Sequence, residues 1–336
     1  MLFCYVAIMM DLAKKILDGD IRAASKLMRD IEDRMPEAVE TLKDLYPKTG
    51  RAYIIGITGS PGAGKSTIID KMVDVFRQEG KSVGIIAVDP TSPFTGGAIL
   101  GDRIRMQRHA TDEGVFIRSV ATRGCLGGLS RATQDLINVM DAMGKDIVLV
   151  ETIGVGQDEV EVVHTAHTSI VVLVPGMGDE IQAIKAGIIE IGDLFVINKC
   201  DREGTDKMER DLRMVLEMGR KHEDGWEPPI FKTDAILGKG IVELIFGIYR
   251  HKQALEQSKG FKKKLREKMK ATFLEILKTE VMAHFVERIE KEGQWESIIE
   301  DLVEKRIDPY SLAEKLMAEE LNHTMDPSIR KRRMSS

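Results

Sequence analysis

The residues from Gly59 to Ser66 have the types and spacing of a loop that binds phosphate groups. They read Gly-Ser-Pro-Gly-Ala-Gly-Lys-Ser, which fits the pattern G-x-x-x-x-G-K-[ST]. Glycines let backbone N–H groups converge on phosphate oxygens at the positive end of the following helix. Lys65 supplies a positive charge for the terminal phosphates, and the Ser66 hydroxyl offers a ligand to Mg²⁺. The motif therefore predicts that a nucleoside triphosphate binds here. The residues expected to contact it are Gly59, Ser60, Pro61, Gly62, Ala63, Gly64, Lys65, Ser66 and Thr67.

A second motif, Asn198-Lys199-Cys200-Asp201, bears on the choice of base. An ionised Asp201 can accept hydrogen bonds from the ring N–H and the exocyclic amine of guanine, whereas adenine would leave the carboxylate unpaired. Asn198 and Lys199 complete the pattern N-K-x-D, and the Lys199 stem can cover the base. Alone, the tetrapeptide could equally be a surface turn, but behind a phosphate loop it favours guanine. Thr233, Asp234 and Ala235 form a weaker signal, in which a backbone N–H meets the guanine carbonyl.

Three acidic residues follow apolar runs or begin helical ones, and each can supply the hard oxygen ligands that Mg²⁺ prefers. Asp89 ends one run, Asp102 begins a helix after a stretch rich in glycine and proline, and Glu151 follows another run. We expect Ser66, Asp89, Asp102 and Glu151 to surround Mg²⁺, and Lys65 and Glu151 to act in catalysis. Gly154 can lend its N–H to a γ-phosphate. The alternative for any single acid is that it caps a helix.

Short apolar runs that alternate with helical stretches must position these motifs. Such runs are typical of parallel strands buried on both faces. They predict an α/β fold, a P-loop NTPase with a mostly parallel sheet flanked by helices. The expected strands are Tyr53–Thr58, Val83–Val88, Ile147–Val150, Ile170–Val174 and Leu194–Ile197, with Val115–Val120 and Pro229–Lys232 as further candidates.

Both ends of the chain have helical rather than strand patterns. From Asp11 to Tyr46 apolar residues recur at three- and four-residue spacing, with a break at Gly19-Asp20. Phe261–Ile289 has a broad apolar stripe of one long helix, and a second helical segment is expected from Trp295 to Leu321. The expected domains are therefore an N-terminal helical extension (1–48), a P-loop GTPase domain (49–257) and a C-terminal helical extension (258–336).

Composition excludes several classes of protein. The chain has 336 residues, of which 43% are hydrophobic and 31% charged, so it can form a core and is not mainly disordered. Its net charge of −5 gives no field that would attract nucleic acid or a membrane surface. The three cysteines, Cys4, Cys125 and Cys200, lie too far apart for a disulfide scaffold, so we expect a cytoplasmic protein. No apolar run reaches the roughly 18 residues that span a bilayer. The apolar residues 1–10 are expected to be a short strand, a frayed terminus or a start assigned upstream, rather than a signal peptide.

The blocks GITGSPGAGKST, DPTSPFTGGAILGDRIRM, ETIGVGQDEV, VPGMGDEIQAIKAGI and NKCD, in this order, resemble the MeaB/ArgK family of GTPases. The similarity covers about residues 11–330, and the block from Asp89 to Met106 is more diagnostic than the phosphate loop, which many families share. Cys200 stands where the family more often has alanine, which leaves Asn198, Lys199 and Asp201 intact.

This resemblance implies a GTP- and GDP-binding, Mg²⁺-dependent chaperone. It also implies that Asp89 and Glu151 act in catalysis beside the metal and the attacking water, and that Asp102 binds Mg²⁺. The partner would be an adenosylcobalamin-dependent acyl-CoA mutase such as methylmalonyl-CoA mutase, whose cofactor loading the chaperone gates and which it protects or reactivates. It also implies that Val174–Lys185 senses the mutase through Asp179, Gln182 and Lys185. Family members are homodimers joined through helical extensions, which suits the stripe of Phe261–Ile289, although a monomer could fold that helix back on its own sheet.

Two other functions fit part of the pattern. A nickel-insertion GTPase would need a Cys/His cluster near the nucleotide. His164 and His167 could share a helical face, but no cysteine neighbours them in the sequence. A kinase acting on amino-acid-binding transport proteins would need ATP and phosphotransfer to protein, against which Asp201 argues. No single arginine stands out for stabilising the transition state among Arg103, Arg105, Arg108 and Arg123.

Overall fold

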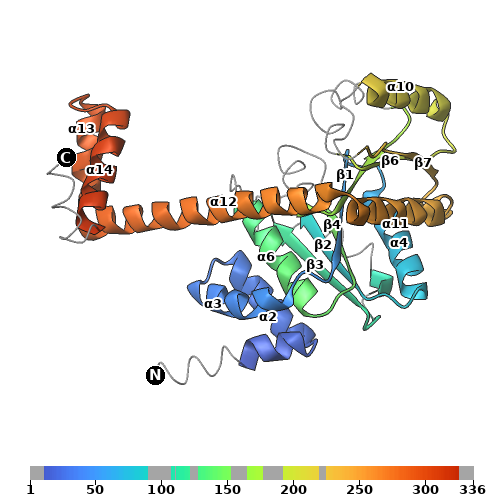
Figure 1. Cartoon of the computed structure of the whole chain (residues 1–336), viewed down its shortest axis with the longest axis horizontal. Helices are drawn as coiled ribbons and strands as arrows, with labels where there is room; N and C mark the ends of the chain where they lie inside the picture. The colour runs from blue at the N-terminus through green and yellow to red at the C-terminus, as the bar shows by residue number, and fades with distance from the viewer. Residues whose placement is uncertain are drawn as a thin grey trace. The chain divides into compact units, whose positions relative to one another are not determined.

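The computed structural model describes residues 11–89, 107–109, 111–121, 128–152, 165–176, 192–218 and 225–324 (Figure 1). The chain divides into two compact units, Met1–Lys268 and Met269–Ser336. The expected strands of the motif-bearing region are all present in the first unit, including the two further candidates. They are β1 (Tyr53–Gly59), β2 (Val83–Asp89), β3 (Val115–Ala121), β4 (Ile147–Glu151), β5 (Thr168–Leu173), β6 (Leu194–Asn198) and β7 (Ile230–Thr233).

These strands form one parallel sheet in the order β3-β2-β4-β1-β5-β6-β7. The order brings β4 and β5 to either side of β1, so the segments that follow these three strands meet at the edge formed by the carboxyl ends of the strands. Open α/β sheets bind their ligands at this edge. The predicted α/β P-loop architecture is confirmed.

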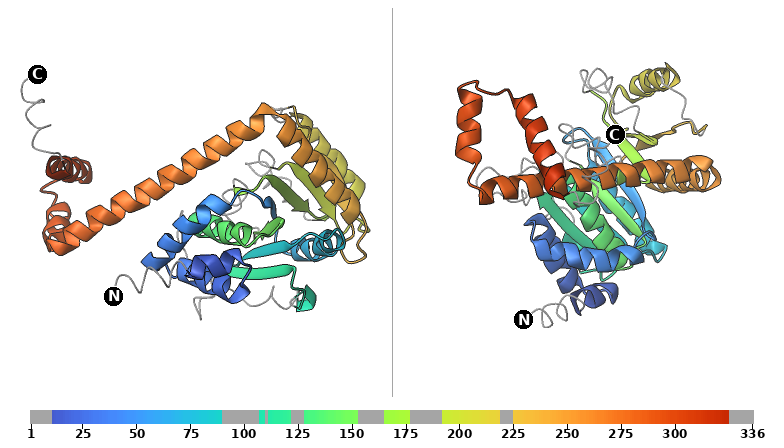
Figure 2. Two further views of the ribbon diagram at one scale, coloured as in Figure 1. Left: turned by 60° about the horizontal axis from the view of Figure 1, so that its bottom comes forward. Right: turned by 60° about the vertical axis from the view of Figure 1, so that its left-hand side comes forward.

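Helices cover both faces of the sheet (Figure 2). On one face, α4 and α11 pack against β1, β4 and β5, and on the other, α2, α3 and α6 share a core with the sheet. The helices and 3₁₀ turns of this unit are α2 (Ile21–Glu32), α3 (Pro36–Leu45), η1 (Tyr46–Lys48), α4 (Lys65–Gln78), η2 (Gln107–His109), α6 (Gly128–Ala142), α10 (Thr205–Met218) and α11 (Ile241–Gln257).

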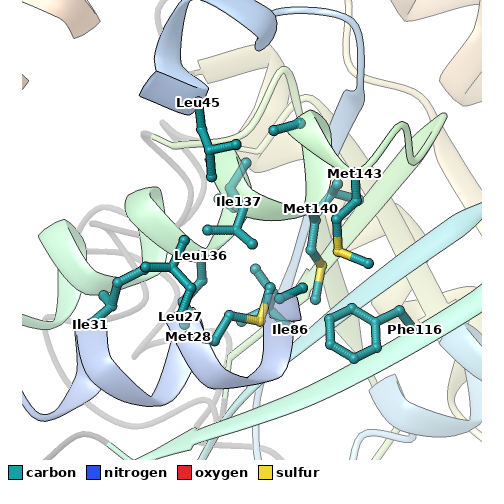
Figure 3. Close-up of a cluster of buried hydrophobic side chains, with 14 of the residues drawn as sticks. Leu27, Met28, Ile31, Leu45, Ile86, Phe116, Leu136, Ile137, Met140 and Met143 are labelled. Atoms are coloured by element: carbon teal, nitrogen blue, oxygen red, sulfur yellow. The ribbon is translucent and has the colours of Figure 1, made fainter. Parts of the chain in front are cut away.

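The N-terminal extension is helical, as expected, and it is part of the main core. The Asp20 carboxylate accepts hydrogen bonds from the amides of Arg22 and Ala23, at 2.8 and 3.0 Å, and so starts α2 at the predicted break. Leu27 and Met28 of α2 pack with Ile137 and Met140 of α6 in one buried cluster (Figure 3). The extension is therefore fixed to the face of the sheet that α6 covers.

The second unit consists of helices. Helix α12 (Lys259–Lys291) begins in the first unit and confirms the predicted long helix. The prediction of one helical segment from Trp295 to Leu321 is wrong, because α13 (Trp295–Val303) and α14 (Pro309–Thr324) are separate helices. Lys305 between them has a left-handed backbone, with φ of 57°, and the Asp308 carboxylate caps the start of α14. Across the described residues, no helix combines the length and the apolar character that crossing a membrane requires.

Candidate nucleotide-binding site

The phosphate loop connects β1 to α4, as its sequence pattern requires. Gly59 has φ of 135°, and a Cβ at this position would overlap the carbonyl oxygen of Val172 in β5, so only glycine fits. Lys65, the first residue of α4, is 5% exposed. Its Nζ donates hydrogen bonds to the carbonyls of Gly59, at 2.5 Å, and Ser60, at 3.1 Å. The lysine thus folds back over its own loop, from where it can reach a bound phosphate.

Two predicted Mg²⁺ ligands lie in direct contact beside this loop. The Ser66 hydroxyl donates to Oε1 of Glu151 at 2.7 Å, and the two residues are 7% and 5% exposed. The contact arises because Glu151, the last residue of β4, is in register with Ile57 of β1, which leads directly into the loop. Asp89 ends β2 at the same edge of the sheet. Asp102 and Gly154 lie outside the described residues.

Asn198 of the base motif holds the phosphate loop from the side. The side chain is 2% exposed, and its Nδ2 donates to the carbonyl of Ala63 at 2.8 Å. Its Oδ1 accepts from the Thr233 hydroxyl, at 3.0 Å, and from the Ala235 amide, at 3.1 Å. One amide side chain therefore joins the phosphate loop to the turn after β7. The predicted base-contacting segments 198–201 and 233–235 lie together.

The rest of the base motif lies at the surface. Lys199 has a left-handed backbone, with φ of 57°, and its Nζ donates to the carbonyl of Gly62 at 2.8 Å. Asp201 follows on an exposed turn. In the turn after β7, the backbone N–H of Asp234 donates to the carbonyl of Lys239 at 3.1 Å. A base stacked on Lys199 would thus lie at the protein surface, on the side where Asp201 is exposed to solvent.

Arg108 is the one candidate arginine that the described residues include. Its guanidinium donates to Asp70, at 2.6 Å, and Asp74, at 2.7 Å, both on α4. The hydrogen bond to Asp70 is the main cause that raises the pKa of Arg108 above its ordinary value. These contacts anchor η2 to the helix that starts at Lys65. Arg103, Arg105 and Arg123 lie outside the described residues.

The positions expected for a partner contact or a nickel site are only partly described. Asp179, Gln182, Lys185 and His164 lie outside the described residues. His167 is described, and its Nδ1 accepts a hydrogen bond from the Ile54 amide at 3.2 Å, which gives the ring a structural role. Within the described parts of the chain, no group of three His, Cys, Asp or Glu side chains could hold a metal ion.

The contacts that join the motifs have no local signal in the sequence. That Asn198 contacts the base stays a prediction, and its hydrogen bond to Ala63 joins residues 135 positions apart in the chain. The pairing of Ser66 with Glu151 likewise depends on β4 lying beside β1, an order that the sequence did not reveal.

Comparison with known proteins identifies relatives over most of the chain. A profile of the family described as Methylmalonyl Co-A mutase-associated GTPase MeaB matches residues 24–290. A protein of Pyrococcus abyssi, named as a GTPase, is 51% identical over 311 residues, which cover 92% of this chain and 96% of the relative. The Methylmalonic aciduria type A homolog, mitochondrial, of Caenorhabditis elegans is 30% identical over 292 residues, 82% of this chain and 73% of that protein. The crystal structure of a LAO/AO transport system kinase superposes with a TM-score of 0.69 at 26% identity, covering 95% of this chain and 98% of that one.

Proposed function

This chain belongs to the methylmalonyl-CoA mutase-associated GTPase (MeaB) family, and we propose that it is a GTPase chaperone of an adenosylcobalamin-dependent acyl-CoA mutase. In this role it would gate loading of the cofactor and protect or reactivate the mutase. The family match carries the proposal, since the family's description names the mutase. The name of the Caenorhabditis elegans relative, which refers to methylmalonic aciduria, supports the same partner.

The site geometry supports a guanine nucleotide bound between the two motifs. The phosphates would lie in the loop from Gly59 to Thr67, and Lys65 would exchange its two carbonyl partners for phosphate oxygens. Asp201 would accept the two N–H groups of guanine, with the base resting on the Lys199 stem. Because Asn198 is hydrogen-bonded to both the loop and the turn at Ala235, the same side chain would hold the phosphate-binding and the base-binding segments in place.

Hydrolysis would proceed by in-line attack of water on the γ-phosphorus, as the bond to the GDP oxygen breaks and phosphate leaves. The protein contributes mainly by positioning the reacting groups and by stabilising the charge on the phosphate oxygens. Lys65 holds the terminal phosphates, while Glu151 and Asp89 bear on the metal and the attacking water from the ends of β4 and β2. Because complete catalytic geometry also depends on residues that follow both strands, we expect slow turnover by the isolated protein.

The residues present fit a magnesium ion. The Ser66 hydroxyl and the Glu151 carboxylate are hard oxygen donors held 2.7 Å apart at the start of α4, beside the expected phosphates. When bound, Mg²⁺ would neutralise charge on the β- and γ-phosphate oxygens. Asp89 and Asp102 are the further proposed ligands.

Removing divalent cations with EDTA is expected to stop GTP hydrolysis and to weaken GTP binding by about tenfold or more, because phosphate charge then lacks its counterion. Glu151→Gln should reduce the Mg²⁺-dependent part of GTP affinity and leave binding in EDTA unchanged. Titration of a fluorescent GTP analogue with and without Mg²⁺ measures both effects. Glu243→Gln, an exposed position on α11, is the matched control. Equal affinities of Glu151→Gln and the parent protein in Mg²⁺ would contradict the assignment.

A pull-down from the native extract tests the proposed partner. Tagged protein loaded with a non-hydrolysable GTP analogue or with GDP should retain a cobalamin-dependent acyl-CoA mutase, identified by mass spectrometry. Gln182→Ala and Lys185→Ala should reduce its recovery, whereas Lys43→Ala, on α3, should not. Recovery of no such mutase in either nucleotide state would count against the proposal. A cytoplasmic location also stays a prediction.

We further propose that the second unit joins two copies of this chain. Helix α12 exposes the apolar side chains Phe273, Leu277, Val281 and Met282 by 44–62% of their surfaces. Aqueous exposure of such a stripe is unfavourable, and a matching helix from a second copy would bury it.

Replacing both Leu277 and Val281 by aspartate is expected to convert a dimer into a monomer, because charges would then have to be buried in the helix contact. Sedimentation equilibrium measures the molar mass directly. Thr279→Asp places a charge on the opposite side of the same helix and should leave the dimer intact. A parent protein that is already monomeric at micromolar concentration would rule out this interface.

A second candidate function is a kinase acting on amino-acid-binding transport proteins. The observation that favours it is the likeness to the crystal structure of a LAO/AO transport system kinase. It requires transfer of the terminal phosphate to a protein, whereas the GTPase function releases it to water. Labelled γ-phosphate recovered as inorganic phosphate supports hydrolysis, and label on a protein supports the kinase.

A further inference from the structure

Two buried threonines link the strand that enters the phosphate loop to the strand that ends at Glu151. Thr58 lies next to last in β1, and Thr152 directly follows β4. Their exposed fractions are 0% and 2%. The Thr152 hydroxyl donates to the Thr58 hydroxyl oxygen at 3.0 Å, and the Thr152 amide donates to the carbonyl of Ile57, also at 3.0 Å. Thr152 is thus tied to β1 through both its main chain and its side chain.

The hydroxyl pair lies on the opposite face of the sheet from Glu151. Side chains alternate along a strand, so adjacent residues point to opposite faces. Glu151 meets Ser66 of α4 on one face. Thr152 has the parity of Val148 and Val150, which belong to the core on the α6 face. The two threonines are therefore enclosed on the face opposite Ser66 and Glu151, so their effect on the reaction is expected to pass through the backbone.

The chain neighbours of Thr58 and Thr152 hold groups that take part in the proposed reaction. Thr58 immediately precedes Gly59, whose carbonyl holds the Lys65 ammonium at 2.5 Å. Thr152 immediately follows Glu151, which holds the Ser66 hydroxyl at 2.7 Å. A shift of β4 along β1 would change the Ser66–Glu151 distance directly. The hydrogen bond between the Thr58 and Thr152 hydroxyl groups opposes such a shift just beyond the end of β4.

We propose that Thr58 and Thr152 are positioning residues for hydrolysis, and that their hydrogen bond sets the place of Glu151 relative to the phosphate loop. This inference rests on the proposed role of Glu151 at the metal. Breaking the bond should affect the Mg²⁺-dependent steps, which need Glu151 in place, and spare nucleotide binding without the metal, which depends on the loop and the base motif.

The test is Thr152→Val, which keeps the shape of the side chain and removes its hydroxyl. We expect kcat for GTP to fall about tenfold, the order expected from losing one buried hydrogen bond. GTP and GDP affinities measured in EDTA should stay within about twofold of the parent values, the variation expected between sites that do not interact. The gain in GTP affinity on adding Mg²⁺ should become smaller. Thr152→Ser keeps the hydroxyl and should restore both quantities.

Two further variants separate positioning from general loss of packing. Thr58→Val breaks the same bond from its other end, so Thr58→Val, Thr152→Val and the double variant should share one kcat defect instead of compounding it. Thr133→Val, on α6, is the matched control, because this fully buried hydroxyl has no hydrogen-bond partner among the described residues. It should leave kcat unchanged. If one valine variant fails to fold, the other still tests the bond.

Several outcomes would overturn the inference: an unchanged kcat in both valine variants, defects that multiply in the double variant, or no rescue by Thr152→Ser. Glu151→Gln separates this failure from failure of the proposed function. If Glu151→Gln loses the Mg²⁺ effect and the threonine variants do not, the positioning role is wrong. If Glu151→Gln also retains it, the role of Glu151 itself is wrong.

Discussion

Replacing Asp201 by asparagine is expected to lower the affinity for GTP and GDP by about 1000-fold, less than at a fully buried hydrogen-bonding site because Asp201 lies on an exposed turn. The carboxylate accepts two hydrogen bonds from guanine, whereas an amide in its place presents one acceptor and one donor. That donor would face an N–H group of guanine. It would instead match the additional carbonyl of xanthine, so affinity for xanthosine triphosphate should rise.

Competition between nucleotides measures this change of preference. Unlabelled GTP, ATP and xanthosine triphosphate are each titrated against a fluorescent nucleotide on the parent and variant proteins. Glu203→Gln changes a neighbouring exposed carboxylate in the same turn and should leave guanine preference intact. A parent protein that binds ATP as tightly as GTP would remove the basis for the base assignment.

Replacing Gly64 by alanine is expected to weaken binding of every nucleotide by about 100-fold, an estimate that combines strain with the loss of a buried hydrogen bond. Gly64 has φ of 90°, which alanine adopts only with strain, and its new Cβ would overlap Nδ2 of Asn198. Asn198 would have to leave the Ala63 carbonyl, and its contacts with Thr233 and Ala235 would shift with it. Phosphate and base recognition would be lost together.

Calorimetric titration with GDP measures the affinity, and circular dichroism checks the fold. Gly80→Ala is the matched control, because Gly80 also has a positive φ, 74°, but lies beyond the end of α4 with open space around its Cβ position. The control carries the backbone strain without the clash. If Gly64→Ala binds GDP as tightly as Gly80→Ala does, the contact of Asn198 with the loop does not matter for binding.

The inner strands β1, β4, β5 and β6 could be predicted from sequence because they are buried on both faces. Leu194–Asn198 and Ile147–Glu151 are fully buried along their length, and continuous apolar runs are typical of such strands. The helical segment after Trp295 was harder, because its apolar pattern continues across the break at Lys305. The break follows from local backbone geometry and from capping by Asp308, which periodicity does not register.

The site was predictable where chemistry is local and not where it depends on the order of the strands. The phosphate loop and the base motif are each contiguous in sequence, so roles for Lys65 and Asp201 could be predicted from residue types and spacing, and these roles stay predictions. The contacts of Asn198 with Ala63 and of Thr152 with Thr58 join segments that are distant in the chain. They arise from the positions of β4, β5 and β6 around β1, which many sequences of the same pattern could arrange differently.

The most direct test of the account is GTP turnover by the purified protein with and without an adenosylcobalamin-dependent acyl-CoA mutase. Phosphate release is followed at saturating GTP and Mg²⁺ while the mutase is titrated. The account predicts a low rate for the protein alone and a rise that saturates as the mutase binds. A rate that stays the same at every mutase concentration, with no complex detected between the two proteins, would contradict it.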